Sequence, residues 1–382
     1  MKRVWGILFI IILLIGTMPL GVSAAPPEVK AKSALLMDVA TGTVLYEQNA
    51  HAPLAPASVT KVMTMLLIME AIDTGRIGWD DTVTASEAAA EKGGSQIYLK
   101  VGETMSVTDM VKSIAVSSAN DCACAMAEHI AGSEAAFVDL MNARAYALGM
   151  QDTKFVNCTG LDDDPSASEH RTSAYDIAIM SRELLKNHPD ITKFTTIWMD
   201  TVRNGTFGLS NTNKMVRFYP GATGLKTGFT SGAGYCLSSS AQRDGLELIA
   251  VVMGCETSKD RFAACKNLLD YGFANYAVVT PQLPENAAVA VHLGKQDFVN
   301  AVATQADPLL VDKSQRNLVT TSVELEEIVN APVSQGQRLG TMTIKVQDQV
   351  IAQIPLVAAQ TVEKLTYWDV LRNALRAFTM AK

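Results

Sequence analysis

The stretch PASVTKVMTMLLIMEAI, residues 56–72, decides the fold. From Val59 to Ile72 nearly every residue is apolar, which predicts a helix that its neighbours bury on all sides. Ser58 and Lys61 stand three residues apart at the start of this helix, so the hydroxyl and the amine are expected on one face, about one turn apart. The stretch therefore predicts a buried helix that begins with a serine–lysine pair.

This pair can supply a nucleophile and its base. A serine hydroxyl holds its proton tightly at neutral pH and needs a base within hydrogen-bond reach to become a nucleophile. Burial on an apolar helix disfavours the ammonium form of Lys61 and lowers its pKa, which would make the amine such a base. The ordinary alternative for Ser-x-x-Lys is a helix-capping serine followed by an exposed lysine.

Two further triplets carry groups that would complete such a site. Ser118-Ala119-Asn120, which is expected to open a helix, offers a hydroxyl that can relay a proton and an amide that can bind a lysine and a substrate carbonyl. Lys226-Thr227-Gly228, on a predicted strand, offers a cation and a hydroxyl for an anionic group, and a glycine that lets a substrate backbone approach. Each triplet alone is a weak signal, but their order and their settings make the set informative.

The elements around these motifs indicate an α+β domain. Strand patterns at both ends flank a block of helices, which implies a sheet that closes around a helical cluster. Strands are expected at 32–38, 43–49, 225–230, 234–242 and 246–253, with a hairpin at Asn204-Gly205. Helices are expected at 59–72, 106–130, 133–149 and 261–276, and a capping box of Ser173 and Asp176 opens another.

The two ends of the chain differ from this region in their residue patterns. Met1-Lys2-Arg3, an apolar run over 4–20 and small residues at 22–25 predict a secretory signal peptide over 1–25, with an uncleaved membrane anchor as the alternative. Pro281 and Pro284 mark a break, after which runs at 287–292, 318–325, 341–346 and 350–356 predict a small all-β domain. The expected divisions are therefore 1–25, a catalytic domain over 26–280, an all-β domain over 281–362 and a tail over 363–382.

The tail predicts an amphipathic helix. Its apolar residues recur at steps of three and four, with charged residues opposite: Leu365, Trp368, Leu371, Leu375 and Phe378 on one face, and Asp369, Arg372 and Arg376 on the other. These charges are too many for a spanning helix and favour one that lies in the membrane surface. The alternative is a terminal helix packed on the β domain.

Composition argues against several classes of protein. A formal net charge of −7 gives no sign of nucleic-acid binding. His51, His129, His188 and His292 form no ligand pattern, which argues against a zinc peptidase, and no metal or other cofactor is expected. His170, in the polar loop SEHRTS, is expected to be a solvent or loop-packing histidine, with a substrate contact as the alternative. The six scattered cysteines favour buried free thiols over disulfides.

The chain resembles the low-molecular-mass penicillin-binding proteins, specifically the D-alanyl-D-alanine carboxypeptidase family of the S11 peptidase type. The similar segments are PASVTKVMT from Pro56, GGSQIYLKVGE from Gly93, MNARAYALGMQDTKFVNCTGL from Met141, TSAYDIA from Thr172, GLKTGFTSGAGYCL from Gly224 and LLDYGF from Leu268. The resemblance implies a transpeptidase/β-lactamase-like catalytic domain with an antiparallel five-stranded sheet and a helical cluster, then a small β domain and a membrane-attaching tail.

The resemblance also implies a role for the first two motifs. Ser58 would be the acylated nucleophile and Lys61 its general base. Ser118 would relay a proton towards the leaving amine, and Asn120 would position the substrate and the lysine.

For the third motif, the resemblance implies substrate binding. Lys226 and Thr227 would hold the carboxylate end of the substrate, and Gly228 would let its backbone approach. The backbone N–H groups of Ser58 and Phe229 would form the oxyanion hole. Phe229 stands where some members have histidine, which keeps the backbone donor and removes a polar side chain. Arg261 would be a further carboxylate contact, with a surface arginine at a helix start as the alternative.

The implied activity is removal of the terminal D-alanine from peptidoglycan pentapeptide stems, with covalent binding of β-lactam antibiotics at Ser58. The protein would be exported and held at the outer face of the cytoplasmic membrane, in cell-wall synthesis. A class A β-lactamase, which deacylates with a glutamate, is faintly suggested by residues 183–187, but Lys186 stands where that pattern has leucine. A non-catalytic envelope scaffold is the other alternative, although it would not need this set of residues.

Overall fold

The computed structural model describes residues 26–162, 165–304 and 308–372. The predicted signal peptide, 1–25, lies outside the described residues. The chain divides into two compact units, one up to Asn275 apart from residues 244–246, and the other from Tyr276 onwards together with those three residues.

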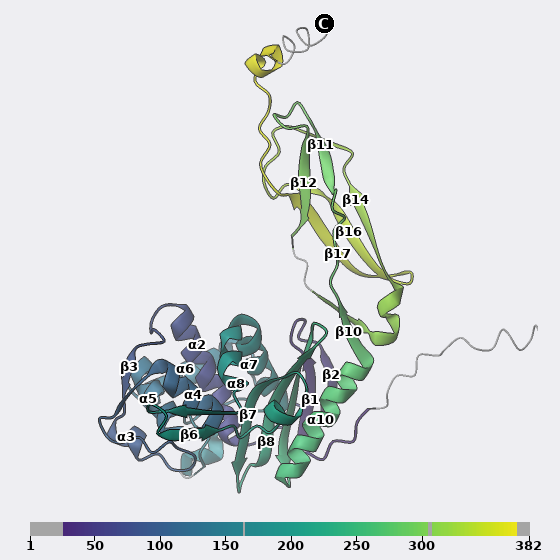
Figure 1. The fold of residues 1–382 in the computed structure, drawn as a ribbon. Helices are drawn as coiled ribbons and strands as arrows, with labels where there is room; N and C mark the ends of the chain where they lie inside the picture. The colour runs from purple at the N-terminus through teal and green to yellow at the C-terminus, as the bar shows by residue number, and fades with distance from the viewer. Residues whose placement is uncertain (1–25, 163–164, 305–307, 373–382) are drawn as a thin grey trace, which may run out of the picture. The chain divides into compact units, whose positions relative to one another are not determined.

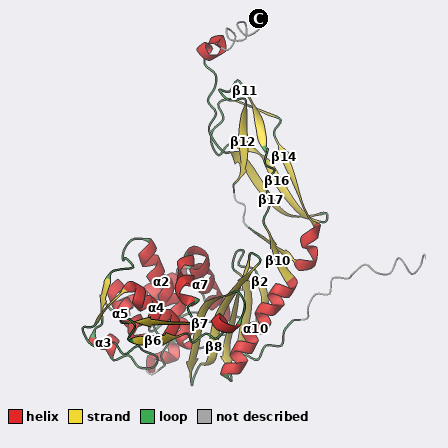
Figure 2. Cartoon of the chain, in the orientation of Figure 1, coloured by secondary structure: helices red, strands yellow, loops and turns green. Residues whose placement is uncertain are grey.

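The first unit is built on a five-stranded sheet with the strand order β2-β1-β9-β8-β7 (Figures 1 and 2). The strands are β1 (Ser33–Asp38), β2 (Val44–Gln48), β7 (Ala222–Thr230), β8 (Gly234–Arg243) and β9 (Leu246–Cys255). Strand β1 pairs antiparallel with β2 and β9, and β7 pairs antiparallel with β8. This confirms the predicted α+β sheet.

Helices cover both faces of this sheet, which explains why its inner strands are apolar throughout. Leu35 and Met37 of β1 belong to the core that the helical cluster closes. Leu36, between them, faces Gly272 of α10 (Ser258–Asn275), where an added Cβ would lie 3.0 Å from its Cδ2. A residue on either face is therefore buried.

The helical cluster surrounds α2 (Lys61–Asp73), which is buried on all sides as predicted. The other long helices of this unit are α4 (Val107–Ser117), α5 (Asn120–Ala131), α6 (Glu134–Ala147) and α7 (Ala174–Asn187). Ser173 caps α7 by accepting a hydrogen bond from the Asp176 N–H group, as expected. The shorter helices are η1 (Ala57–Thr60), α3 (Glu87–Ala90), η2 (Pro165–Glu169), η3 (Pro189–Ile191), α8 (Thr192–Thr195) and α9 (Met215–Phe218). Two antiparallel strand pairs complete the unit: β3 (Thr82–Thr84) with β4 (Thr104–Ser106), and β5 (Met199–Val202) with β6 (Phe207–Ser210).

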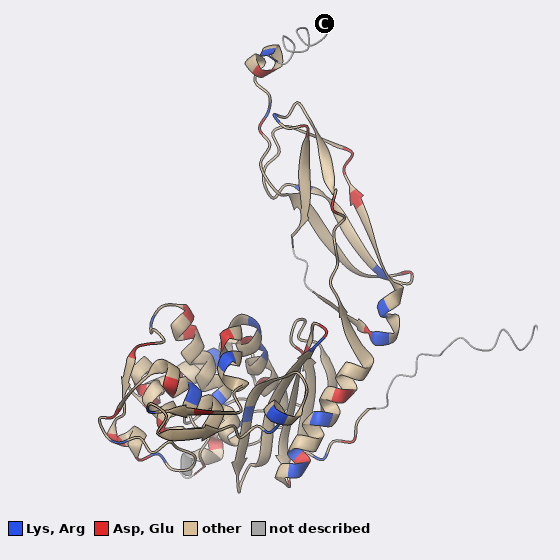
Figure 3. Ribbon diagram, viewed as in Figure 1, with Lys and Arg blue, Asp and Glu red and all other residues tan. Residues whose placement is uncertain are grey.

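The prediction of one helix over 106–130 is wrong. Ser118 has a left-handed backbone with φ +64°, which ends α4, and Asn120 begins α5. The predicted helix at 261–276 begins earlier, at Ser258, and it carries both basic and acidic residues (Figure 3). All six cysteines are buried and free, as their spacing predicted.

The second unit is all-β, as predicted. Its six-stranded sheet has the order β14-β16-β17-β12-β11-β15. The strands are β11 (Ala288–His292), β12 (Phe298–Ala303), β14 (Val319–Leu325), β15 (Ile328–Asn330), β16 (Arg338–Val346) and β17 (Gln349–Ala358). A separate pair joins β10 (Tyr276–Val279) to β13 (Leu309–Asp312), and η4 (Lys313–Leu318) follows it. The unit has its own core, which includes Val299, Leu339 and Leu356.

The start of the predicted tail helix is described. Residues 367–372 are helical, and Thr366 caps them by accepting from the Asp369 N–H group while donating to the Asp369 carboxylate. Trp368 is 69% exposed and Leu371 is 39% exposed. Leu375, Arg376 and Phe378 lie outside the described residues. Within the described ranges, no helix has both the length and the apolar character needed to cross a membrane.

Candidate active site

Ser58 and Lys61 meet as the sequence predicts. Ser58 lies in the turn η1, immediately before α2. The Lys61 Nζ atom lies 3.0 Å from Ser58 Oγ and donates to the Thr159 carbonyl at 2.8 Å. The Lys61 side chain is fully buried, and this desolvation lowers its pKa from 10.5 to about 7, although Cys158 and Asp121 oppose the shift. The alternative of an exposed lysine is therefore wrong, and the amine can be neutral near physiological pH.

Strand β7 touches the nucleophile turn through Gly228. A Cβ atom added there would lie 2.6 Å from the Pro56 carbonyl oxygen and 3.1 Å from the Ser58 nitrogen. Only glycine fits so close an approach of two backbones. The contact sets the backbone of Gly228 and Phe229 alongside that of Ser58, where two N–H groups could serve one oxyanion.

Ser118 and Asn120 lie on either side of the break between α4 and α5, and both are buried. The Asn120 N–H group donates to the Ser95 carbonyl at 2.7 Å, and its Nδ2 donates to the Gly93 carbonyl at 2.7 Å. Among the described groups, Asn120 Oδ1 is buried without a hydrogen-bond partner. The loop at 93–95 thus uses the donor end of this amide, and an acceptor remains for an incoming N–H group.

Lys226 and Thr227 are also buried on β7. Burial holds the pKa of Lys226 well below its usual range, and the nearby cations Lys61 and Arg261 lower it further. Thr227 Oγ1 is hydrogen bonded to Thr212 Oγ1 at 2.7 Å. An anion bound here would restore the charged form of Lys226, which suits the carboxylate predicted from the sequence.

Comparison with known proteins identifies the family of this chain. The family described as D-alanyl-D-alanine carboxypeptidase, peptidase S11, matches residues 21–257. The chain belongs to this family. It is therefore a serine-type peptidase. The family described as penicillin-binding protein 5, C-terminal domain, matches residues 282–364, which covers the all-β unit.

Individual relatives extend the match to most of the chain. The D-alanyl-D-alanine carboxypeptidase DacF of Bacillus subtilis is 43% identical over 360 residues, 92% of this chain and 91% of that protein. Penicillin-binding protein 5 from Haemophilus influenzae has a TM-score of 0.73 and 30% identity, over 89% of this chain and 100% of that one. Penicillin-binding protein D2 from Listeria monocytogenes, solved in an ampicillin-bound form, has a TM-score of 0.59 and 33% identity over 65% of this chain and 100% of that one.

Arg261 of this carboxypeptidase-family chain is not a surface residue. Its side chain is 7% exposed, and Nη1 donates to the Gly228 carbonyl at 3.0 Å and to the Cys236 carbonyl at 3.3 Å. Its guanidinium also lies over the Tyr235 ring, 5.3 Å from the ring centroid. The alternative of an ordinary surface arginine is therefore wrong, and Arg261 fixes the strand that carries the third motif.

Phe229 is the exposed member of the predicted set. Its ring is 53% exposed and stacks on Tyr235 with a centroid separation of 4.2 Å. The chain thus carries an apolar platform next to Gly228.

Three polar partners of the site were not predicted as such. They are Thr159, Thr212 and His170, of which His170 is 4% exposed and lies 2.7 Å from Thr60 Oγ1. The expectation of a loop-packing histidine is confirmed, whereas a solvent-exposed one is wrong. The carbonyl of Thr159 and the hydroxyl of Thr212 left no signal in the sequence, because their partners, Lys61 and Thr227, are not at a helical or strand spacing from them.

The glutamate stretch at 183–187 does not form a second catalytic site. Glu183 accepts a hydrogen bond from Arg144 at 2.7 Å, and Arg144 also binds Glu70 at 2.7 Å. Glu70, Glu183 and His188 have ligand atoms within 4.8 Å of one another, but Arg144 forms an ion pair with each of the two carboxylates. An ion-pair network explains this cluster.

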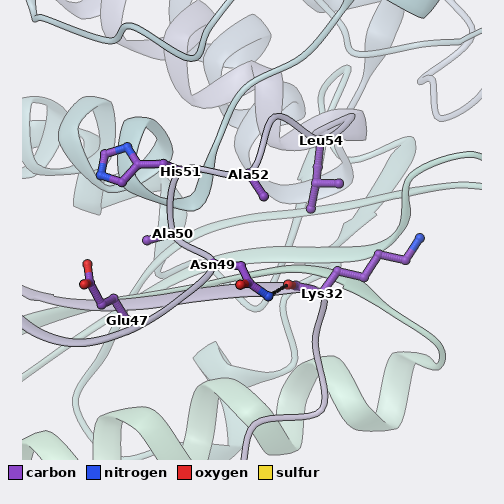
Figure 4. A pocket seen from close by; sticks show the side chains of 7 residues that line it. All are labelled: Lys32, Glu47, Asn49, Ala50, His51, Ala52 and Leu54. Carbon is purple, nitrogen blue, oxygen red and sulfur yellow. Dashed lines mark hydrogen bonds between the residues drawn. The ribbon is translucent and has the colours of Figure 1, made fainter.

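A surface hollow of about 490 Å³ lies apart from this chemistry. Figure 4 shows its lining, which consists of Lys32, Glu47, Asn49, Ala50, His51, Ala52 and Leu54. The Asn49 amide donates to the Lys32 carbonyl, and His51 is hydrogen bonded to Asp152. None of the predicted catalytic residues lines it.

Proposed function

We propose that Ser58 attacks the carbonyl of the penultimate D-alanine of a peptidoglycan pentapeptide stem, and that the terminal D-alanine leaves. The observation that carries this proposal is the fully buried Lys61 amine, which has its pKa at about 7 and lies 3.0 Å from Ser58 Oγ. Such an amine can take the serine proton as the oxygen–carbon bond forms.

The remaining groups provide for the rest of the reaction. The N–H groups of Ser58 and Phe229 stabilise the oxyanion of the tetrahedral intermediate. Ser118 relays the proton from Lys61 to the leaving amine as the carbon–nitrogen bond breaks, which leaves the peptide esterified to Ser58. Water then attacks this ester with Lys61 as base, and the serine regains its proton. No metal or other cofactor takes part in these steps.

Residues of the second and third motifs bind the substrate. Lys226 and Thr227 hold the terminal carboxylate, and the free Asn120 Oδ1 accepts a substrate N–H group. Arg261 holds the Gly228 carbonyl and adds positive charge for the same carboxylate. Gly228 leaves room for the peptide backbone beside the strand.

Penicillins are proposed to acylate Ser58, because a β-lactam presents a strained amide and a carboxylate to the same groups. The ampicillin-bound form of the Listeria relative supports this proposal. A class A β-lactamase is less well supported, since Glu183 is paired with Arg144. A non-catalytic scaffold would not require a lysine desolvated beside a serine.

The location proposed for the enzyme is the cell envelope. Residues 1–25 would direct export, 26–280 would carry the catalysis, and 281–362 would form the all-β domain. The tail, 363–382, would lie in the outer surface of the cytoplasmic membrane, and the exposed Trp368 and Leu371 in its first turns support this.

Two measurements on the purified protein test the reaction. Mass spectrometry of a pentapeptide ending in D-alanyl-D-alanine should show the loss of one alanine. Peptide mapping after incubation with penicillin should place the adduct on Ser58, and a folded Ser58→Ala variant should carry none. An unchanged pentapeptide, or an adduct that persists in this variant, would overturn the proposal.

A further inference from the structure

The residue before the nucleophile has an unfavourable backbone. Ala57 is buried and has φ +48°, in the left-handed region that residues other than glycine seldom adopt. This conformation orients the peptide unit between Ala57 and Ser58, which carries the Ser58 N–H group. Such a conformation persists only where the surroundings hold it.

Thr60 and Gly160 hold the Ala57 carbonyl. The Thr60 hydroxyl donates to this oxygen at 2.9 Å. Gly160 packs so closely that an added Cβ would lie 1.9 Å from the same oxygen. Since the Thr60 hydroxyl has given its one proton to Ala57, it can only accept from its other neighbour.

That other neighbour is His170. Its Nδ1 accepts from the Val156 N–H group at 3.2 Å, so the proton of the neutral ring lies on Nε2. Nε2 is 2.7 Å from Thr60 Oγ1 and donates to it. Burial and the nearby Lys61 lower the pKa of His170 to about 4, in keeping with a neutral ring. The hydrogen bonds therefore run in one direction, from Val156 through His170 and Thr60 to Ala57.

We propose that His170 is a positioning residue for the nucleophile: through Thr60 it holds Ala57 in the left-handed conformation that aims the Ser58 N–H group at the oxyanion. This inference rests on the function proposed above. His170 has no part in proton transfer, because its ring nitrogens are occupied by Val156 and Thr60. The other reading is that His170 only fills space beside Phe155, whose ring it meets edge-on.

Two substitutions separate the roles of the two ring nitrogens of His170. In His170→Gln, the amide can reach the place of Nε2 and donate to Thr60, while the acceptor for Val156 is lost. In His170→Asn, the amide can reach the place of Nδ1 and accept from Val156, while the donor to Thr60 is lost. Thr60→Val removes the hydroxyl between them at nearly constant volume.

The experiment measures the rate constant for acylation of Ser58 by a fluorescent penicillin, with the melting temperature of each variant. We expect His170→Asn and Thr60→Val each to slow acylation by roughly 10- to 100-fold, a misplaced oxyanion donor being costly. His170→Gln should retain a rate within a few-fold of native. A double variant that combines His170→Asn with Thr60→Val should be no slower than either single change, because both break one chain of contacts.

Ser181→Ala is the matched control. It removes a buried hydroxyl bond, to Ser238 at 2.8 Å, without touching the turn η1. It should lower the melting temperature and leave acylation unchanged.

The outcomes distinguish this inference from the proposed function. No adduct in the native protein overturns both. A normal native rate with equal losses in His170→Gln and His170→Asn, or with additive losses in the double variant, overturns only the role of His170. Should His170→Asn fail to fold, a native rate in Thr60→Val would overturn it equally.

Discussion

Replacing Lys61 by methionine should separate catalysis from stability. Burial lowers the pKa of this fully buried amine from 10.5 to about 7. At 1.36 kcal/mol for each unit of pKa shift, burial of this amine opposes folding by on the order of 5 kcal/mol at pH 7 and below. Methionine has a similar volume and does not titrate, so the variant does not have this cost of folding. It leaves the Thr159 carbonyl without its hydrogen-bond donor, at a cost of about 1–3 kcal/mol. The variant should therefore be as stable as the native protein at pH 7, or more stable.

The pH dependence gives the sign of the effect. Unfolded Lys61 binds a proton below pH 10.5, whereas the folded protein binds it only below about pH 7. Native stability therefore rises with pH between these values, and the variant lacks this contribution. From pH 7 to pH 9 the free energy of unfolding of the native protein should gain about 2 kcal/mol relative to Lys61→Met. Lys226 is present in both proteins, so the part of its pH dependence that burial causes cancels, whereas the part that Lys61 contributes does not.

Urea unfolding at the two pH values measures this difference, and acylation by a fluorescent penicillin measures the chemistry. Loss of the general base should slow acylation by roughly 10²–10⁴-fold or more. The native rate should rise as Lys61 deprotonates near pH 7 and then level off. Parallel stability curves for the two proteins would show that the amine is not desolvated. Near-native acylation by the folded variant would place the base elsewhere, with Ser118 the next candidate.

Two further predictions test the fold and the tail. Gly160→Ala should prevent folding, because its Cβ would lie 1.9 Å from the Ala57 carbonyl oxygen. Gly102 also has a left-handed backbone, with φ +77°, but nothing lies within 4 Å of an added Cβ, so Gly102→Ala should lower the free energy of unfolding in urea by only about 1 kcal/mol. Equal stability of the two variants would contradict the close packing. Removal of residues 363–382 should abolish co-sedimentation with anionic liposomes and leave activity on a soluble peptide intact. Equal sedimentation of both forms would exclude the tail as the anchor.

The sequence predicted most of the fold because its main elements have strong local signals. Helix α2 and the inner strands are continuous apolar runs, and both faces of the sheet are covered. The motif was expected to open a helix, as Asn120 does, but the end of α4 at Ser118 was not predicted, since the run SSAND contains neither glycine nor proline. Tertiary contacts override local preference there: the Asn120 N–H group binds Ser95 and its side chain binds Gly93.

The site was predictable only where spacing reveals chemistry. Ser58 and Lys61 are neighbours on one helix, so their contact follows from helical geometry. The second partner of Lys61 is the Thr159 carbonyl, and every residue has a carbonyl, so no residue type marks it. Arg261 shows the same limit in a different way, because a charged residue in the first turn of a helix usually faces solvent, whereas here it lies under β7.

The backbone conformations that local sequence does not predict occur at residues of the active site. Ala57 and Ser118 both have left-handed backbones, and one precedes the nucleophile while the other is the second serine of the site. Neither residue type favours that conformation, so the free energy comes from contacts made across the unit. A sequence optimised only for local preference would continue α4 through Ser118 and keep Ala57 right-handed. It could still form the same sheet, but it would lose both the second motif and the orientation of the Ser58 N–H group.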